Sequence, residues 1–337
     1  FLIISEIYLF LFRTHVKLGN RHKLSVGTEY IVDVLKSQTD NIAKEDAYTL
    51  ALFAQDEIKL LRNLQALIGV RYIYHENFKN HATPNVALMY KPGKFNFRAS
   101  YAAGFRTPTL SELYATDIAK KNDRLTIGNL DLKPEKNNYF SLSAEYVHER
   151  FSVSVNAFYN NIRDMIDYNT IATGDKAMEQ YGHKEVRQRD NIAEAKVHGI
   201  NVSANAYLGA GFNLSGGYTH LNTQDVELEQ PIDKSIKNAY NINAQWAHSW
   251  KIYRLNINLN GRFNSKRFSK SYGYAPEYQL WDLNTRHSFN LKSVIIEPGF
   301  GMENLFDYMD DRPYNSNYAT LTPGRSFYIS LSLKFKS

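Results

Sequence analysis

Three histidines and one charged stretch are the parts of this sequence whose side chains could do chemistry. His75, His81 and His183 lie in polar stretches, and a neutral imidazole is a reasonable iron ligand. The stretch 104–136 adds a phenol, an acid and three cations, which are Tyr114, Asp117, Lys120, Lys121 and Arg124. We predict that these side chains contact a bulky substrate. A lone loop histidine is more often simply solvated, so we predict neither a protein-built metal site nor a resident cofactor.

Catalytic patterns are missing from the sequence. It contains no cysteine, which removes thiol nucleophiles and Cys-ligated metals, and it has no G-x-S-x-G, H-E-x-x-H, P-loop or dinucleotide-binding glycine motif. The formal net charge of +6 is spread along the chain and forms no basic block. We therefore expect neither an enzyme nor a nucleic-acid partner.

Two proline-containing boxes bound the charged stretch. They are "FRTP" from Phe105 to Pro108 and "NLDLKPE" from Asn129 to Glu135. The prolines fix φ and stiffen both ends of the stretch 104–136, which we call the excursion. In "TLSELY", Thr109 and Glu112 have the spacing of a capping box and predict a short helical turn. Arg106 could bind a substrate carboxylate, but the favoured interpretation pairs it with Glu112 or Glu135 at the loop base.

The elements that must position these groups are strands. A period of two places apolar residues on one face and polar residues on the other, as in "NNYFSLSAEYVH", "FSVSVNAFYNN" and "RLNINLN". The polar face uses Asn, Ser, Gln and Glu, so it should border water or a polar filling, while the apolar face should border lipid. Such long strands are typical of membrane spans. We predict an antiparallel transmembrane β-barrel of about 14–15 strands.

Connections of alternating length support this prediction. Tight links are expected near 19–21, 91–94, 149–150, 209–211, 249–251 and 290–292. Longer polar stretches lie at 36–46, 76–84, 104–136, 169–189, 223–236, 267–277 and 306–324. Short turns on one side and long loops on the other are the asymmetry of outer-membrane barrels. No segment approaches the roughly 18 apolar residues of a spanning helix, so a helical membrane protein is excluded.

The two boxes, with "MENLFDY" (Met302 to Tyr308) and the final "PGRSFYISLSLKF", resemble the TonB-dependent outer-membrane receptors. The resemblance implies a 22-stranded barrel of which residues 1–337 form the C-terminal part, with the plug domain and the first strands absent. It also implies a place in the Gram-negative outer membrane. The implied loop-box residues are Phe105, Arg106, Pro108, Asn129, Leu130, Leu132, Pro134 and Glu135.

The resemblance further implies a receptor that binds a metal chelate at its extracellular loops and imports it with energy from TonB. The chelate is haem, cobalamin or a ferric siderophore, and lipid surrounds the barrel. A surface lipoprotein could cap it. The histidine that haem receptors usually carry between the boxes is absent here. A passive porin is the alternative, and a soluble β-propeller is a third interpretation that lacks the 40–50-residue repeats it requires.

Overall fold

The computed structural model describes residues 3–37, 42–119, 123–269, 273–310 and 322–336. Within them, seventeen strands form one sheet, and setting aside the short β7 and β8 leaves fifteen long wall strands. These are β1 (Ile3–Leu18), β2 (His22–Ser37), β3 (Ile42–Leu61), β4 (Leu64–His75), β5 (Lys79–Tyr90), β6 (Phe95–Arg106), β9 (Glu135–Val147), β10 (Phe151–Thr173), β11 (Glu185–Gly209), β12 (Phe212–Asp225), β13 (Asn238–Trp250), β14 (Tyr253–Asn264), β17 (Tyr278–Asn290), β18 (Val294–Glu303) and β19 (Ser326–Phe335).

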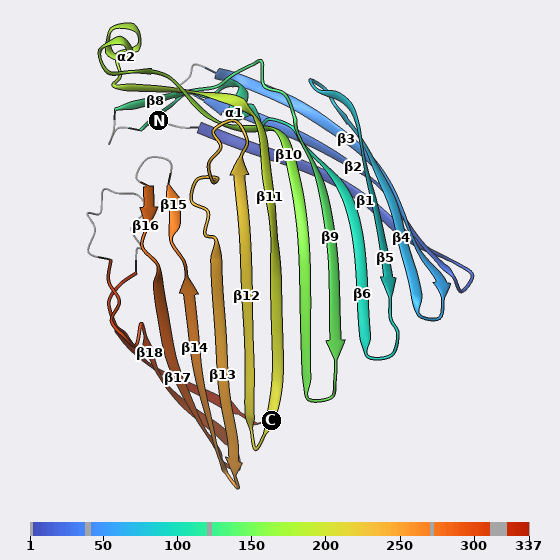
Figure 1. Cartoon of the computed structure of the whole chain (residues 1–337), viewed down its shortest axis with the longest axis vertical. Helices are drawn as coiled ribbons and strands as arrows, with labels where there is room; N and C mark the ends of the chain where they lie inside the picture. Colours follow the sequence, from blue (N-terminus) through green and yellow to red (C-terminus); the bar gives the residue numbers. More distant parts are fainter. Residues whose placement is uncertain (1–2, 38–41, 120–122, 270–272, 311–321, 337) are drawn as a thin grey trace.

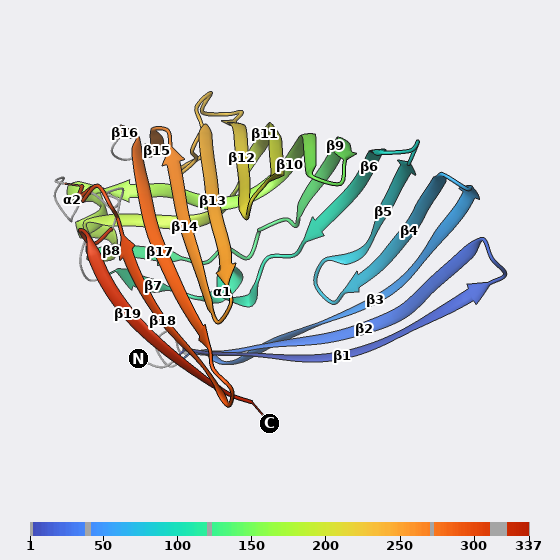
Figure 2. The same ribbon diagram turned by 90° about the horizontal axis from the view of Figure 1, so that it is seen from below.

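Each wall strand pairs antiparallel with the next wall strand along the chain. In the β9–β10 pair, for example, the register runs without a shift from Ser152 opposite Val147 to Arg163 opposite Lys136. The sheet bends into a trough (Figures 1 and 2). Its concave inner face carries polar residues such as Ser100, Ser141 and Asn137. In the described residues β1 and β19 do not pair with each other, so the sheet does not close on itself.

Alternation decides which face each side chain occupies. Phe140 and Leu142 of β9 lie on the outer face and are 48% and 63% exposed, whereas Ser141 between them points inward and bonds Ser100 of β6 at 2.7 Å. Large exposed apolar side chains recur in this way on almost every wall strand. An outer surface of this kind is stable only against lipid. None of the helices in the described residues is long and apolar enough to cross a membrane.

The connections differ in length at the two ends of the wall. Tight turns at 19–21, 62–63, 91–94, 148–150, 210–211, 251–252 and 291–293 form one end, which we call the short-turn end. The opposite loop end carries the long connections, as predicted. Two loop predictions were wrong in extent. Residues 76–84 are a three-residue turn followed by β5, and within 169–189 the two ends, 169–173 and 185–189, belong to β10 and β11. Those two strands extend beyond the wall as a hairpin closed by α2 (Gly174–Tyr181).

Aromatic rings line the outer face in two belts. The belt nearer the loop end contains the contacting rings Tyr30, Tyr48, Tyr74, Tyr101, Phe140, Tyr159, Tyr218, Tyr240 and Phe263. The belt at the short-turn end contains Phe95, Tyr146, Phe151, Phe212, Trp246, Trp250, Tyr253 and Phe289. From Phe151 to Tyr159 the rise is about 26 Å along β10, which after strand tilt is close to the apolar band of a membrane barrel.

Candidate functional site at the loop end

The excursion between β6 and β9 folds back across the loop end of the trough. It contains α1 (Leu110–Tyr114), β7 (Asp117–Ala119) and β8 (Arg124–Ile127). Helix α1 contacts β2 and β3, while β8 pairs parallel with residues 185–188 of β11. Figure 2 shows these elements on the inner side of the wall. One segment therefore ties together two parts of the wall that are far apart in sequence.

Helix α1 begins with the predicted capping box and is anchored by two leucines. The Thr109 hydroxyl accepts the Glu112 N–H at 3.2 Å, and the Glu112 carboxylate accepts the Thr109 N–H at 2.9 Å. Leu110 packs with Leu35 and Ala47, in an apolar cluster on β2 and β3. On the other side, Leu113 packs in a second cluster, completed by Leu132 and Ile166. These clusters hold the excursion in place by excluding apolar surface from water.

Arg106 links both ends of the excursion to one guanidinium. It donates two hydrogen bonds to Glu135, at 2.7 and 2.6 Å, and its third nitrogen donates to both oxygens of Glu112, at 2.9 and 3.3 Å. The Glu135 carboxylate also accepts the backbone N–H of Ile166 at 2.8 Å. These contacts raise the pKa of Arg106, with the Glu135 hydrogen bonds as the largest cause. Burial alone would raise the pKa of Glu112, but hydrogen bonds from Arg106 and Thr109 outweigh it and lower that pKa.

The second box is held by amide side chains and one buried leucine. Asn129 accepts the N–H of Asp131 at 2.9 Å and donates to the carbonyl of Arg189 at 3.0 Å. Asn191 of β11 accepts the Lys133 N–H and donates to the Lys133 carbonyl, which fixes the chain just before Pro134. Sequence patterns did not indicate Asn191, because its partner lies 58 residues away. Leu132 is buried, whereas Leu130 is exposed.

Two of the three candidate histidines form hydrogen bonds and ring contacts within the protein. His75 is buried, and its Nδ1 accepts the N–H groups of Asn77 and Phe78 at 3.1 and 3.4 Å. His81 stacks on Phe105 of the first box with ring centroids 3.8 Å apart, and its Nε2 lies 2.9 Å from the carbonyl oxygen of Phe78. The His75 ring therefore stabilises the turn between β4 and β5, and the His81 ring packs against the end of β6.

His183 has a different environment. Its Nδ1 lies 2.9 Å from Oδ1 of Asp123, beside α2 and the start of β8. The hydrogen bond from His183 is the largest cause that lowers the pKa of Asp123. A histidine that donates Nδ1–H to a carboxylate presents Nε2 as a ligand, the arrangement found behind many metal-bound imidazoles. The described residues contain no group of three or more potential metal-binding side chains.

The remaining candidates fall into three groups. Tyr114 packs against both leucine clusters and is part of the scaffold, while Asp117 is exposed on β7. The guanidinium Nε of Arg124 is buried on β8 and has no hydrogen-bond partner in the described part of the chain. Lys120 and Lys121 lie outside the described residues. Beside this region Arg189 lies over the ring of Tyr168 at 3.9 Å, a cation–π pair that the sequence did not indicate.

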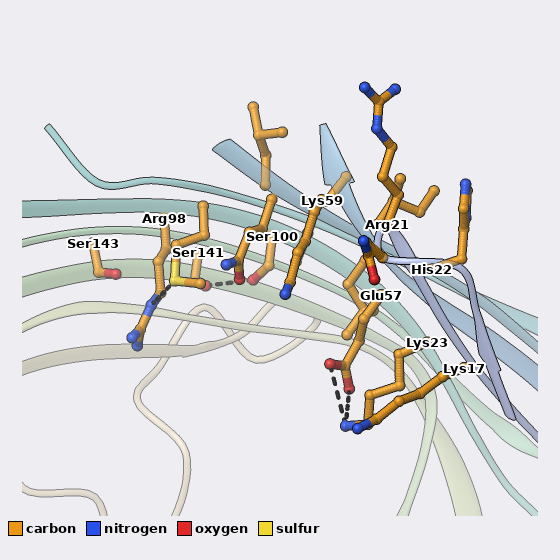
Figure 3. Close-up of a pocket in the computed structure, with 18 of the residues that line it drawn as sticks. Lys17, Arg21, His22, Lys23, Glu57, Lys59, Arg98, Ser100, Ser141 and Ser143 are labelled. Atoms are coloured by element: carbon orange, nitrogen blue, oxygen red, sulfur yellow. Dashed lines mark hydrogen bonds and ion pairs between the residues drawn. The ribbon is translucent and has the colours of Figure 1, made fainter. Parts of the chain in front are cut away.

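A cavity lies on the inner face near the short-turn end. It has a volume of about 720 Å³, and its lining residues include five lysines or arginines and one acid, Glu57. Figure 3 shows Lys17 and Lys23 directed to the same place as Glu57, with Lys23 paired to that carboxylate at 3.2 Å. Arg98 lies further along the same cavity. The cavity is thus positive and faces the trough.

The chain is similar to known proteins in sequence and in fold. Residues 6–305 match the family model described as "TonB dependent receptor-like, beta-barrel". The ferric enterobactin receptor PfeA of Pseudomonas aeruginosa superposes with a TM-score of 0.81 at 19% identity, over 99% of this chain and 54% of that one. The siderophore receptor PirA of the same organism gives a TM-score of 0.76 at 18% identity, over 99% of this chain and 57% of that one.

A copper transporter, OprC, also shares the fold, with a TM-score of 0.74 at 11% identity over 99% of this chain and 56% of that one. The chain thus spans slightly more than half the length of the solved structures it matches. The matches cover all fifteen wall strands together with the excursion, since they extend over almost the entire chain.

Proposed function

Because this chain belongs to the TonB-dependent receptor family of outer-membrane β-barrel transporters, we propose that it forms part of the barrel of a receptor that imports a ferric chelate. The chelate binds at the loop end, and TonB supplies the energy for its passage. The full protein carries a plug domain against the polar inner face, and the positive cavity near the short-turn end is part of that contact surface. Membership of this family argues against a porin, in which solutes diffuse passively through an open lumen.

The observation that carries the proposal is the ordered excursion across the loop end. This long loop is fixed by the ion pairs of Arg106, by two leucine clusters and by a parallel strand pairing. Ordered loops of this length are usually functional, and this one presents a fixed binding surface. Its described cations include Arg124, whose buried Nε has no hydrogen-bond partner among the described residues. Arg189 of β11 is joined to the loop, because its carbonyl accepts a hydrogen bond from Asn129. A buried donor without a partner calls for an explanation, and an anionic ligand supplies one.

These side chains favour a ferric siderophore over haem. Siderophore complexes present oxygen-rich and often anionic surfaces, which guanidinium groups bind strongly. His75 and His81, by contrast, have internal partners and pack against phenylalanine rings. Two of the similar structures are named as siderophore receptors, which agrees with this choice of cargo.

One observation supports haem as an alternative cargo. The Asp123–His183 pair leaves Nε2 of His183 available as a single axial ligand, which would suit haem. Under this alternative His183→Ala abolishes the Soret shift that follows addition of haem, while ferric siderophores do not bind. A ferric-siderophore receptor shows the reverse, with binding unchanged by His183→Ala.

A binding assay on the full-length receptor tests the proposal. Tryptophan fluorescence quenching is measured with ferric catecholate and hydroxamate siderophores, haem and cobalamin. We expect one ferric siderophore class to bind, and Arg124→Gln to weaken that binding by about tenfold, the loss of one charge-assisted hydrogen bond. Arg150→Gln, at the short-turn end, is the matched control and should leave binding unchanged. Absence of binding to any chelate, or uptake that does not depend on TonB, contradicts the proposal.

A further inference from the structure

Three cations gather on the outer, lipid-facing side of the wall at the loop end of β9, β10 and β11. Lys136 lies directly opposite Arg163 in the β9–β10 register, and Arg163 lies opposite Glu194 of β11. Lys196 lies two residues along β11 from Glu194, on the same face. Neighbours across a sheet are about 5 Å apart and diagonal neighbours about 7–8 Å. We call Lys136, Arg163 and Lys196 the outer cation patch.

Strand parity places this patch on the outside. Lys136 has the same parity as Phe140 and Leu142, which are exposed apolar residues of β9. Arg163 has the parity of Tyr159 and Val155 of β10, and the register through this region has no shift. The adjacent residues of opposite parity point inward, as shown by the hydrogen bond between Asn137 and Asn160. The three cations are therefore outside the trough and apart from the excursion.

The height of the patch matches a lipid headgroup. Arg163 is four residues beyond Tyr159, and Lys136 is four residues beyond Phe140, both of the loop-end aromatic belt. Four strand residues rise about 13 Å, or about 10 Å along the membrane normal at the usual tilt. Aromatic belts mark the boundary between hydrocarbon and headgroups. The patch therefore lies just above the hydrocarbon, where phosphate groups of the facing leaflet are located.

The charges of the patch are only partly balanced. Lys196 lies 3.7 Å from Glu194, a long contact between partly exposed groups that contributes little. Lys136 and Arg163 are exposed, and within the described residues neither forms an ion pair. Three cations and one carboxylate thus leave a net positive surface beside exposed apolar side chains such as Phe140 and Tyr159. Such a combination recognises an amphiphile with an anionic head.

We propose that the outer cation patch binds the phosphate groups of an anionic lipid headgroup in the leaflet at the loop end. Lys136 and Arg163 bind the phosphate, Lys196 extends the site towards a second one, and Phe140 and Tyr159 contact the acyl chains below. The interaction fixes the depth and orientation of this wall segment in the membrane. It needs the outer-membrane placement of the chain but not any particular cargo.

Native mass spectrometry of the full-length receptor tests this site. The probe is bis-phosphorylated lipid A, compared with its monophosphorylated form and with phosphatidylcholine. In the variant Lys136→Gln/Arg163→Gln/Lys196→Gln we expect at least about a tenfold loss of bound bis-phosphorylated lipid A, because each cation near a membrane surface contributes measurably. Glu194→Gln should increase retention. Inorganic phosphate at millimolar concentration should not displace the lipid, since the acyl contacts are also required.

The matched control is the variant Lys91→Gln/Lys94→Gln/Lys292→Gln. It removes the same charge from exposed residues of short-turn connections, which face the opposite leaflet. Its lipid A retention should stay within twofold of the unmodified receptor. Equal retention in the patch variant, equal loss in the control, or displacement by inorganic phosphate would each overturn the proposal. Heat-modifiable migration on gels verifies that every variant has folded, and chelate binding should be the same in all of them.

Discussion

At the scale of single residues, Arg106 determines how the excursion leaves the wall and how it returns. Its side chain comes from the last residue of β6 and pairs with Glu135, the first residue of β9, and with Glu112 of α1. Both carboxylates are less than a fifth exposed, so each depends on this guanidinium for its charge balance. In its contacts Arg106 is thus a structural hub, in agreement with the favoured interpretation that pairs it with Glu112 or Glu135.

Arg106→Gln should loosen the excursion without unfolding the wall. The change leaves two mostly buried carboxylates close together and without their cation, and we expect a local loss of about 1–3 kcal/mol. Hydrogen–deuterium exchange of the full-length receptor should show faster exchange across 109–134 and no change in β13 or β14. Arg150→Gln serves as the control. Unchanged exchange in the excursion would show that the leucine clusters alone hold it.

The same hub should make the excursion sensitive to acid. The pKa of Glu112 in the folded protein is lowered from 4.5, so its contribution to stability is fully present above that value. It is lost as the pH falls below 4.5 and passes the lowered pKa, where the carboxylate takes up a proton. Proteolysis of the excursion should therefore increase below about pH 4.5, and Glu112→Gln should remove this dependence. An equally steep acid response in Glu112→Gln would assign the effect to another carboxylate.

At the scale of elements, the excursion depends on a close crossing of two segments. A Cβ added to Gly128 would lie 2.5 Å from the carbonyl oxygen of Leu113 and 2.7 Å from its carbon. The loop after β8 therefore passes directly against the end of α1, and the N–H of Asn129 bonds the Glu112 carbonyl at 3.1 Å. A glycine here permits the two backbones to approach.

Gly128→Ala should separate α1 from β8. The Leu113 carbonyl belongs to the backbone and cannot rotate away as a side chain could, so we expect a cost of about 1–3 kcal/mol. Limited proteolysis should cut the variant within the excursion faster than the unmodified protein. Ser111→Ala, at an exposed position of α1, is the control and should be cut at the original rate. An unaltered cleavage rate in Gly128→Ala would mean that the crossing is loose.

Local patterns predicted the elements whose signals lie within a few residues. The wall strands, the turns with glycine and the capping box of α1 all follow from neighbouring side chains. Residues 79–84 were expected to be loop because the stretch is polar and contains Asn80 and Pro84, which are poor strand formers, yet Pro84 pairs with Val70 in register. The pairing of β8 with β11 and the docking of Leu110 on Leu35 join distant segments, and no local pattern specifies them.

At the scale of the whole molecule, one alternation assigns every wall residue to lipid or to the trough. The two aromatic belts bound the lipid-facing band, and the polar inner face carries ion pairs such as Arg71–Glu29 at 2.5 Å. The residue pair Leu142 and Ser143 lies between the belts, with Leu142 outward and Ser143 lining the positive inner cavity. Of two residues adjacent in sequence, one therefore faces lipid and the other faces the trough.

Substituting an acid at each position of this pair tests the assignment in the full-length receptor. A charged residue in mid-membrane costs up to about 2–4 kcal/mol on the lipid face, with acids at the lower end, so Leu142→Glu should reduce the heat-modifiable folded fraction in outer membranes. Ser143→Glu places its carboxylate opposite Arg98, its partner in the β6–β9 register, and should leave that fraction unchanged. If both variants assembled equally well, Leu142 would not face lipid. If Ser143→Glu alone failed, the two faces of the sheet would have to be exchanged, and with them the position of the outer cation patch.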